Sequence, residues 1–383
     1  MRIRSAIAFL LPAVRAWYDC PFPKCETCLP VGVHDAPGIG FAIEFSYGTA
    51  AAHFYNGTVV NIAKVPSTPE HAKLIVRLSS LPHPPQETVL GRWRRSINKI
   101  LGRPATPEVD TLATMFAALR DATSTALAIP IDRVVVTHPV LPGLTVADIA
   151  DALDYAGLRP WLGAGPAEPP AHAGLYPSKL IEGNAVYATH GFGLCGDFKD
   201  LFECGEEEEN MPLHTILLAG LTRRDLRAEV VRLRAPFNAD QRLLARFVDL
   251  GAGTDAMERY VSSDAFWGHV QKQLEASVRQ SPAPLTKVML TGENATHPSF
   301  LATLKDALAR CGYHAGEGGI QLEVDEQVGD PTFASARGAA QYARWRQEAP
   351  ISCREQHSCE EEQQKIRRDD NPQESKSGRV ELK

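Results

Sequence analysis

The residues best placed to bind an anion form a small-residue turn near the start of the chain. Residues 39–45 are mostly apolar with Glu44 near their end, and Ser46, Gly48 and Thr49 follow. Backbone N–H groups in such a turn can approach a phosphate closely, because few side chains stand in the way. An ordinary antiparallel hairpin without a ligand explains the same residues. The stretch therefore predicts strand, turn and strand, and phosphate binding is the chemistry it could support.

A second candidate turn lies late in the chain. The apolar run 287–290 leads to Gly292, Glu293 and Asn294, and Pro298 then begins a segment with helical spacing. Proline is favoured in the first turn of a helix, where its missing N–H is not needed. The stretch therefore predicts a buried strand, a glycine turn and a helix.

Regular elements are expected around these turns. Apolar spacing predicts helices at 69–80, 111–128 and 264–278, and the run 133–139 reads as a buried strand that ends at His138. His138 is interpreted as a strand-end residue without chemistry. The four glutamates at 206–209 lack the spacing of a calcium site, so a solvated loop is expected there.

In this order the elements resemble the superfamily of actin, sugar kinases and heat-shock-chaperone ATPases, above all the chaperone nucleotide-binding domain. Residues 38–60 resemble its first phosphate loop, 287–309 its adenosine loop, and 330–343 its final helix. His-Gly-Phe-Gly-Leu-Cys at 190–195, followed by Cys204 and the acidic run, is similar to a group of uncharacterised secreted fungal proteins with an actin-like ATPase domain. The resemblance implies an α/β protein with the two-lobed actin-like (ribonuclease H-like) fold and a shortened second-lobe insertion.

The second phosphate loop of that family has two possible counterparts in this chain. Residues 213–233 read as strand, turn and strand at the expected place in the order, but they lack the metal-binding Asp and most glycines. Residues 247–255 spell the loop almost letter for letter, yet a helix is expected soon after them. We align Asp249 to Gly253 with a different family segment, one that enters a helix, and keep 213–233 as the second loop.

The resemblance implies a degenerate nucleotide site, because Glu44 replaces an Asp and Ser46 replaces a Gly of the family pattern. The residues that it assigns to this site are Glu44, Ser46, Tyr47, Gly48, Thr49, Gly220, Thr222, Gly292, Glu293 and Asn294. Catalysis would require a divalent metal held by carboxylates at the phosphate loops. We therefore expect a secreted, non-catalytic structural or interaction protein without a metal or cofactor. The alternative is a chaperone-like ATPase that binds ATP with Mg²⁺, and a sugar kinase is the weakest reading.

Composition and the N-terminal residues indicate where the protein is located and which kinds of partner it can bind. The chain has 383 residues and a net charge of −6, which gives no electrostatic case for nucleic acid, while a protein partner is compatible with it. Residues 1–16 read as a signal peptide cleaved after Ala16, with a packed N-terminal helix as the alternative. Their apolar run is too short to span a membrane. Secretion is the expected location.

All eight cysteines follow residue 16, as in proteins that form disulfides in an oxidising compartment. We expect a Cys195–Cys204 disulfide across the insert that the chaperones lack. Cys353 and Cys359 are expected to pair within the tail or to stay free. The partners of four further cysteines remain open: Cys20, Cys25, Cys28 and Cys311. A zinc site at Cys25 and Cys28 lacks a second pair of ligands.

Export would make two Asn-x-Thr sequons, at Asn56 and Asn294, available for glycosylation. A glycan on Asn294 would stand at the mouth of the nucleotide cleft that the resemblance implies. The expected organisation is a Cys-containing segment at 17–37, a first lobe at 38–183, a second lobe at 184–349 and a disordered tail at 350–383.

Residues 91–103 form a strongly basic segment with apolar residues at helical spacing. One interpretation is a patch for nucleic acid or an anionic membrane. The other is an ordinary helix that exposes its basic face and buries Trp93, Ile97, Ile100 and Leu101, and the sequence favours this second interpretation.

Overall fold

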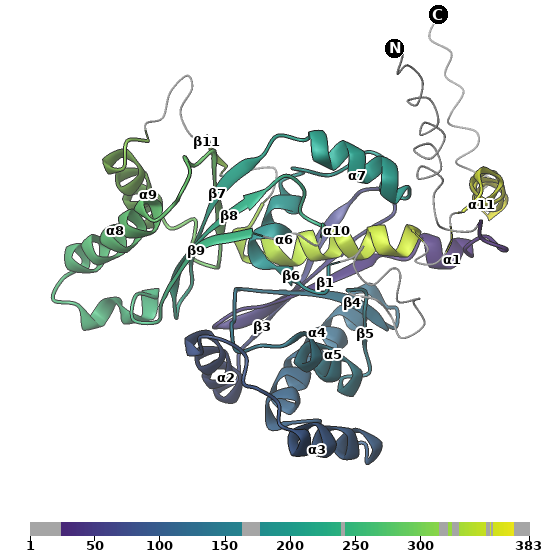
Figure 1. The fold of residues 1–383 in the computed structure, drawn as a ribbon, viewed down its shortest axis with the longest axis horizontal. Helices are drawn as coiled ribbons and strands as arrows, with labels where there is room; N and C mark the ends of the chain where they lie inside the picture. The colour runs from purple at the N-terminus through teal and green to yellow at the C-terminus, as the bar shows by residue number, and fades with distance from the viewer. Residues whose placement is uncertain are drawn as a thin grey trace, which may run out of the picture.

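The computed structural model describes residues 24–162, 177–238, 242–313, 321–323, 329–349, 353 and 355–370. The expected signal peptide and Cys20 lie outside these ranges. The described chain forms two mixed α/β lobes, with the first lobe in the lower half of Figure 1 and the second at its upper left. None of the described helices is long and apolar enough to cross a membrane.

The first sheet has the strand order β3-β2-β1-β4-β5, and β6 also pairs with β4. The neighbours β1, β2 and β3 are antiparallel, whereas β4 is parallel to β1. The strands are β1 (Gly38–Ile43), β2 (Tyr47–His53), β3 (Val59–Pro66), β4 (Arg133–His138), β5 (Arg159–Pro160) and β6 (Leu180–Ile181).

The second sheet repeats this arrangement with the order β9-β8-β7-β10-β11. Its strands β7, β8 and β9 are antiparallel, and β10 is parallel to both β7 and β11. The strands are β7 (His214–Leu221), β8 (Leu226–Leu233), β9 (Arg242–Asp249), β10 (Lys287–Thr291) and β11 (Gln321–Glu323). Each lobe therefore begins with a hairpin whose turn, at 44–46 or 222–225, lies at the same place in its sheet.

Helices cover both faces of each sheet, and their apolar side chains form the hydrophobic cores together with those of the strands. The first sheet packs against α2 (Pro69–Ser80), α4 (Pro107–Leu127) and α5 (Val146–Tyr155) on one face and α10 (Ala334–Glu348) on the other. The second sheet packs against α8 (Ser263–Arg279) and α9 (Pro298–Arg310) on one face and α6 (Glu182–Thr189) on the other. Short 3₁₀ helices lie at Thr254–Arg259 and Pro331–Phe333.

Local sequence explains where several of these helices begin. Thr68 and Thr106 each accept a hydrogen bond from the first turn of α2 or α4, and a proline follows each of them. Thr145 and Asp148 form a capping box at the start of α5.

Helix α10 joins the two lobes. It follows the second sheet in sequence, yet it packs on β1 of the first sheet and against α6 (Figure 1). A Cβ atom on Gly40 would overlap the backbone of α10, and one on Gly338 would overlap the carbonyl of Ala185 in α6. Glycine at these positions lets the three backbones approach closely.

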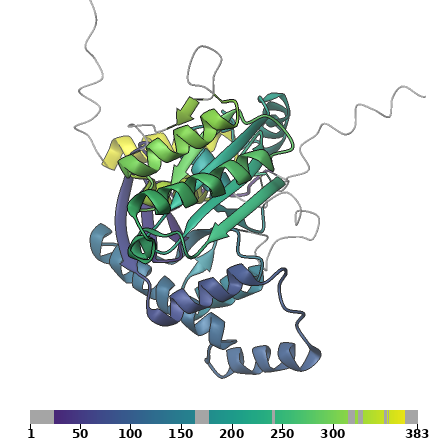
Figure 2. The same ribbon diagram turned by 90° about the vertical axis from the view of Figure 1, so that its left-hand side faces the viewer.

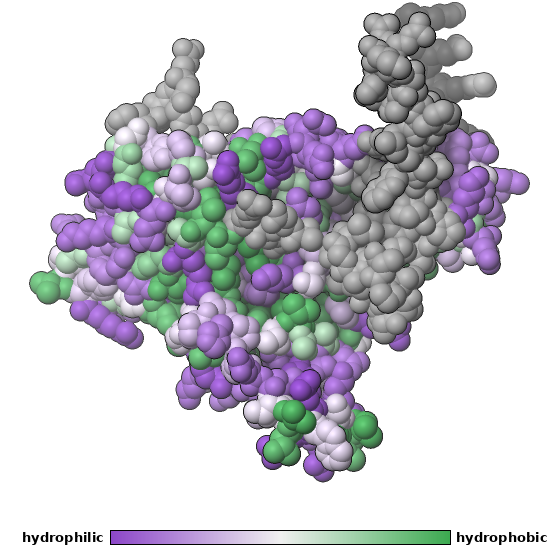
Figure 3. Space-filling view, viewed as in Figure 1, coloured by the Kyte–Doolittle hydropathy of each residue, from purple (hydrophilic) through white to green (hydrophobic). Residues whose placement is uncertain are grey.

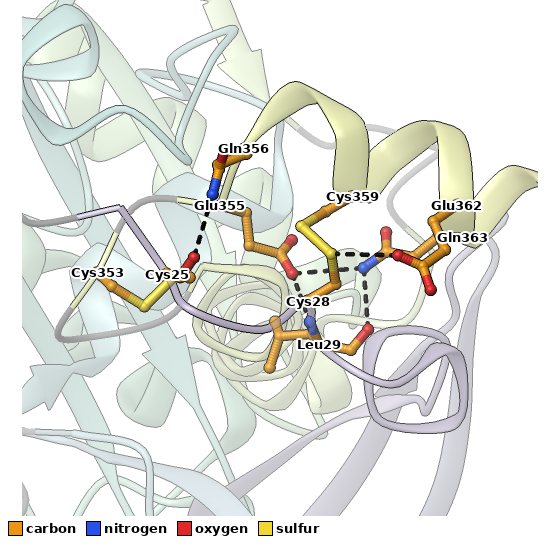
Figure 4. Close-up of a disulfide and its surroundings, with 9 residues drawn as sticks. All are labelled: Cys25, Cys28, Leu29, Cys353, Glu355, Gln356, Cys359, Glu362 and Gln363. Atoms are coloured by element: carbon orange, nitrogen blue, oxygen red, sulfur yellow. Dashed lines mark hydrogen bonds between the residues drawn. A yellow bond between two sulfur atoms is a disulfide. The ribbon is translucent and has the colours of Figure 1, made fainter.

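The two ends of the described chain are tied together, which corrects two expectations. Cys353 bonds to Cys25, and Cys359 bonds to Cys28, across 328 and 331 positions of sequence. Cys359 lies in α11 (His357–Asp370), which begins within the stretch expected to be disordered. Figure 4 shows both bridges beside one another at the start of α11. Neither partner could be found from local composition, because the pairing joins the two ends of the chain.

Polar contacts reinforce these bridges. The backbone N–H of Leu29 donates to Glu355 at 2.6 Å, and Gln363 donates to the carbonyl of Leu29 at 3.0 Å (Figure 4). Near them, Arg367 of α11 pairs with Asp35 at 2.6 Å, close to the end of α1 (Val31–His34). The N-terminal segment is therefore held by covalent and polar contacts together.

The insert contains the expected Cys195–Cys204 disulfide, and Cys311 is free. The acidic run at 206–209 is not in a loop, since it lies in the helix α7 (Leu201–Asn210). Burial raises the pKa of Glu208 in this helix to about 7. The remaining helix of the first lobe, α3 (Val89–Ile100), projects from its lower end (Figure 2).

Candidate functional site

The hairpin turns of the two lobes face one another across a carboxylate. Glu293, just after β10, accepts a hydrogen bond from the Ser46 hydroxyl at 3.1 Å and from the Arg223 backbone N–H at 3.2 Å. The Lys64 ammonium of β3 forms an ion pair with the same carboxylate. We call Ser46, Lys64, Arg223 and Glu293 the carboxylate bridge, and it connects the first sheet to the second.

A buried arginine lies next to this bridge. Arg227 of β8 is 1% exposed and contacts carboxylates from three segments. Its guanidinium lies 2.5 Å from Glu44 at the end of β1, 2.6 Å from Glu182 at the start of α6, and 2.8 Å from Asp225. These four residues are the arginine cluster, and all four are buried.

Gly220 makes space for the arginine. It pairs with Arg227 across the β7–β8 hairpin, and an added Cβ atom would lie 2.9 Å from the Arg227 Cγ. The resemblance assigned Gly220 to the degenerate nucleotide site. In the structure its missing side chain accommodates Arg227 instead.

Further hydroxyl groups complete the cluster. Thr291 at the end of β10 donates to Glu182 at 2.5 Å, and Ser335 of α10 donates to the same carboxylate at 3.4 Å. The Thr222 hydroxyl donates to Asp225, which fixes the turn before β8. Both lobes and the helices α6 and α10 therefore contribute to one hydrogen-bonded centre, which consists of the carboxylate bridge, the arginine cluster and these hydroxyl groups.

The charges of the cluster are unequal, because one guanidinium faces three carboxyl groups. Burial raises the pKa of Glu44 well above its ordinary value, although Arg227 opposes this shift. Burial likewise raises the pKa of Asp225. Burial disfavours the charged form of Arg227, but Glu182, Glu44 and Asp225 together raise its pKa well above the ordinary value. The three carboxyl groups thus favour the charged form of Arg227, while burial opposes the charged form of Glu44.

Glu229 lies two residues after Arg227 on β8 and adds another buried carboxyl group. Its carboxylate accepts a hydrogen bond from the Val140 backbone N–H at 3.1 Å. Burial, with a contribution from Glu182, raises the pKa of Glu229 to about 7. Because residues two apart on a strand share a face, Arg227 and Glu229 both lie on the side of β8 that meets the other lobe.

The remaining residues assigned to the first turn are part of the sheet. Strand β2 already begins at Tyr47, and Gly48 is paired on both sides, with Ile43 of β1 and Val65 of β3. Tyr47 and Thr49 are buried. Of the expected small-residue turn, only Ser46 takes part in the carboxylate bridge.

The expected adenosine turn packs against the second sheet. The Asn294 backbone N–H donates to the Leu221 carbonyl at 3.0 Å, and its side-chain nitrogen donates to Thr254 at 2.8 Å. Gly292 is buried. A glycan on Asn294 would replace one hydrogen of the nitrogen that donates to Thr254, whereas Asn56 lies on an exposed hairpin turn.

The alternative loop at 247–255 does not reach the centre through its first carboxylate. Asp249 ends β9 and binds His269 of α8 at 2.7 Å, and the chain continues into a 3₁₀ helix rather than a hairpin. Asp255 pairs with the exposed side chain of Arg223 at 3.0 Å. His138 is buried at the end of β4, where it contacts the Pro139 carbonyl at 2.7 Å.

Sequence reasoning missed Glu182, Asp225, Arg227 and Glu229. A signal was present, since the charged residues Arg227 and Glu229 alternate with apolar residues at the start of β8. Such a strand must place two charges on one face. Only the position of the other lobe shows that this face is buried.

The sequence matches no protein-family model and no curated protein. The geometry of the centre is therefore the main evidence for function.

Proposed function

We propose that the chain is a degenerate member of the actin-like ATPase superfamily that acts, after export, as a non-catalytic structural or interaction protein. The sequence resemblance and the strand order that both lobes share support the fold assignment. Three disulfides among the described cysteines are typical of an oxidising compartment and support export.

The observation that carries the non-catalytic role is the occupation of the centre by the protein's own side chains. A nucleotide phosphate needs hydrogen-bond donors from both hairpin turns. Ser46 and the Arg223 backbone N–H already donate to Glu293. A carboxylate has the negative charge and acceptor oxygens of a phosphate, so Glu293 competes with a ligand for these donors.

The arginine cluster also occupies the position where the family would bind a metal ion. A magnesium ion requires ionised oxygen ligands and several waters. Glu44, at the position of the family's carboxylate, is buried and bound to Arg227. A divalent cation beside it would meet the positive charge of the guanidinium. The cluster therefore serves to hold the lobes together.

Thermal unfolding with Mg-ATP and Mg-ADP tests this proposal. A ligand at about a hundred times its dissociation constant stabilises a protein by about 2.7 kcal/mol, which would raise the melting temperature by several degrees. We expect no shift for the wild-type protein. A reproducible shift would overturn the proposal and favour the ATP-binding alternative.

The variant Glu293→Ala separates the exclusion of phosphate by Glu293 from the exclusion of a metal ion by the arginine cluster. It frees Ser46 and the Arg223 N–H while leaving the arginine cluster intact. We expect no nucleotide shift in this variant either, because Arg227 still blocks the metal position. A shift that appears only in the variant would contradict the assignment of metal exclusion to the arginine cluster.

A further inference from the structure

Helix α3 exposes its apolar side chains. Leu90, Trp93 and Ile100 are 82%, 70% and 84% exposed, and no residue of this helix is buried. In the view of Figure 3, hydrophobic residues stand at the lower protrusion that α3 forms in Figure 1. The expectation that the apolar face packs on the domain is therefore wrong. Val89, Ile97 and Leu101 add to the same exposed group.

The opposite, basic side of α3 faces the protein. Arg95 lies 2.5 Å from Asp151 and 3.1 Å from Asp148, both on α5, and Lys99 lies 2.5 Å from Asp151. These ion pairs fix the orientation of the helix. At 100° per residue, the apolar side chains then gather on the side that points away from α5.

Three arginines in α3 and just after it have no acidic partner among the described residues. Arg92, Arg94 and Arg103 are exposed and form no ion pair with any described residue, and α3 contains no acidic residue. An amphipathic helix with tryptophan and aliphatic residues on one side and free basic residues beside them is typical of proteins that lie in a membrane interface. We propose that α3 docks the protein on the surface of a bilayer that contains anionic lipids.

In this arrangement the apolar side chains enter the boundary between headgroups and acyl chains. The three arginines extend to the lipid phosphates, as long basic side chains do at interfaces. The chain carries a net charge of −6, so the attraction comes from this local group and must weaken as salt is added.

Charge and size disfavour a second copy of the chain as the occupant. Two α3 helices packed face to face would bring the unpaired arginines of both copies together. The apolar face of a 12-residue helix is also small beside the roughly 1,200 Å² or more that a stable interface buries. An anionic bilayer satisfies the apolar and the basic residues at once.

Sedimentation of the full chain with lipid vesicles tests the proposal. We expect binding to vesicles of phosphatidylcholine with about one-third phosphatidylserine, weaker binding to pure phosphatidylcholine, and weaker binding at high salt. Leu90→Ser/Ile100→Ser and Arg92→Glu/Arg94→Glu should each reduce binding by about tenfold or more. Their melting temperatures should stay close to wild type, since these side chains are exposed.

Matched controls on the second lobe are Val261→Ser, an exposed apolar residue, and Lys272→Glu/Lys305→Glu, two exposed lysines. Both should bind vesicles like the wild type. Absence of wild-type binding at low salt would overturn the proposal, as would equal loss in the control variants. Self-association that the α3 variants abolish, without vesicle binding, would assign the face to a second copy instead.

Discussion

The centre of the molecule and helix α3 distribute charged and apolar residues in opposite ways. Between the lobes, Arg227 and its carboxylates are buried. On α3, by contrast, Leu90 and Ile100 are exposed while Arg95 faces the protein. Charged side chains are seldom fully buried unless they are paired, and a surface helix normally turns its apolar face inward. The buried charges therefore indicate a specific contact between the lobes, and the exposed apolar residues indicate a contact outside the described chain.

The difference between the regions indicates which contact each one makes. The buried charges have all their partners within the chain, so their effect is on the stability and relative position of the two lobes. The apolar residues of α3 have no partner within the described chain, so their effect is on association with something outside it. Substitutions should separate the two kinds of effect.

The largest effect is expected at Arg227. Arg227→Met leaves Glu44, Glu182 and Asp225 buried without a cation, and breaking a buried ion pair in this way costs about 3–5 kcal/mol. Urea unfolding measures this loss. Arg232→Met, at the exposed residue near the end of the same strand, and Trp93→Ser on α3 should each stay within about 0.5 kcal/mol of wild type. Equal losses at Arg227 and Arg232 would erase the contrast between the regions.

A smaller effect is expected from pH at Glu229. Its pKa is raised by burial to about 7, above its ordinary value, so the folded protein holds a proton that the unfolded chain has released. The associated stability is fully present below about pH 4.5 and is lost as the pH rises through about 7. The charged groups around it are Glu182, Arg227 and Arg246.

Glu229→Gln mimics the protonated carboxyl group and should remove this part of the pH dependence. Between about pH 5 and about pH 8, the melting temperature of the wild type should fall by a few degrees more than that of the variant, since each pKa unit corresponds to about 1.4 kcal/mol. Parallel curves for the two proteins would show that Glu229 does not titrate in this range.

Much of the local structure could be predicted from the sequence. The hairpin at the start of each lobe, the helix α2 at 69–80 and the strand that ends at His138 follow from apolar spacing, turn residues and caps. An α/β protein with two mixed sheets is confirmed. These features depend on residues close together in the chain, where periodicity and capping are informative.

The rest depends on contacts between distant segments. The spacing of α3 predicts an amphipathic helix equally well whichever face lies inward, and the ion pairs of Arg95 with α5 decide the orientation. The partners of Cys25 and Cys28 lie at the far end of the chain. Arg227 reads as a surface residue of a hairpin until the other lobe places Glu44 against it.

Arg227 and Glu44 form an ion pair between the two lobes, at the position that the proposed resemblance assigns to a nucleotide. A double-mutant cycle with Arg227→Met and Glu44→Gln measures this contact directly by urea unfolding. We predict that the double variant is more stable than the sum of the single losses allows, with a coupling energy of about 1–3 kcal/mol, because Gln at position 44 removes one uncompensated buried charge. Losses that add within about 0.5 kcal/mol would contradict a direct contact between the lobes at this pair.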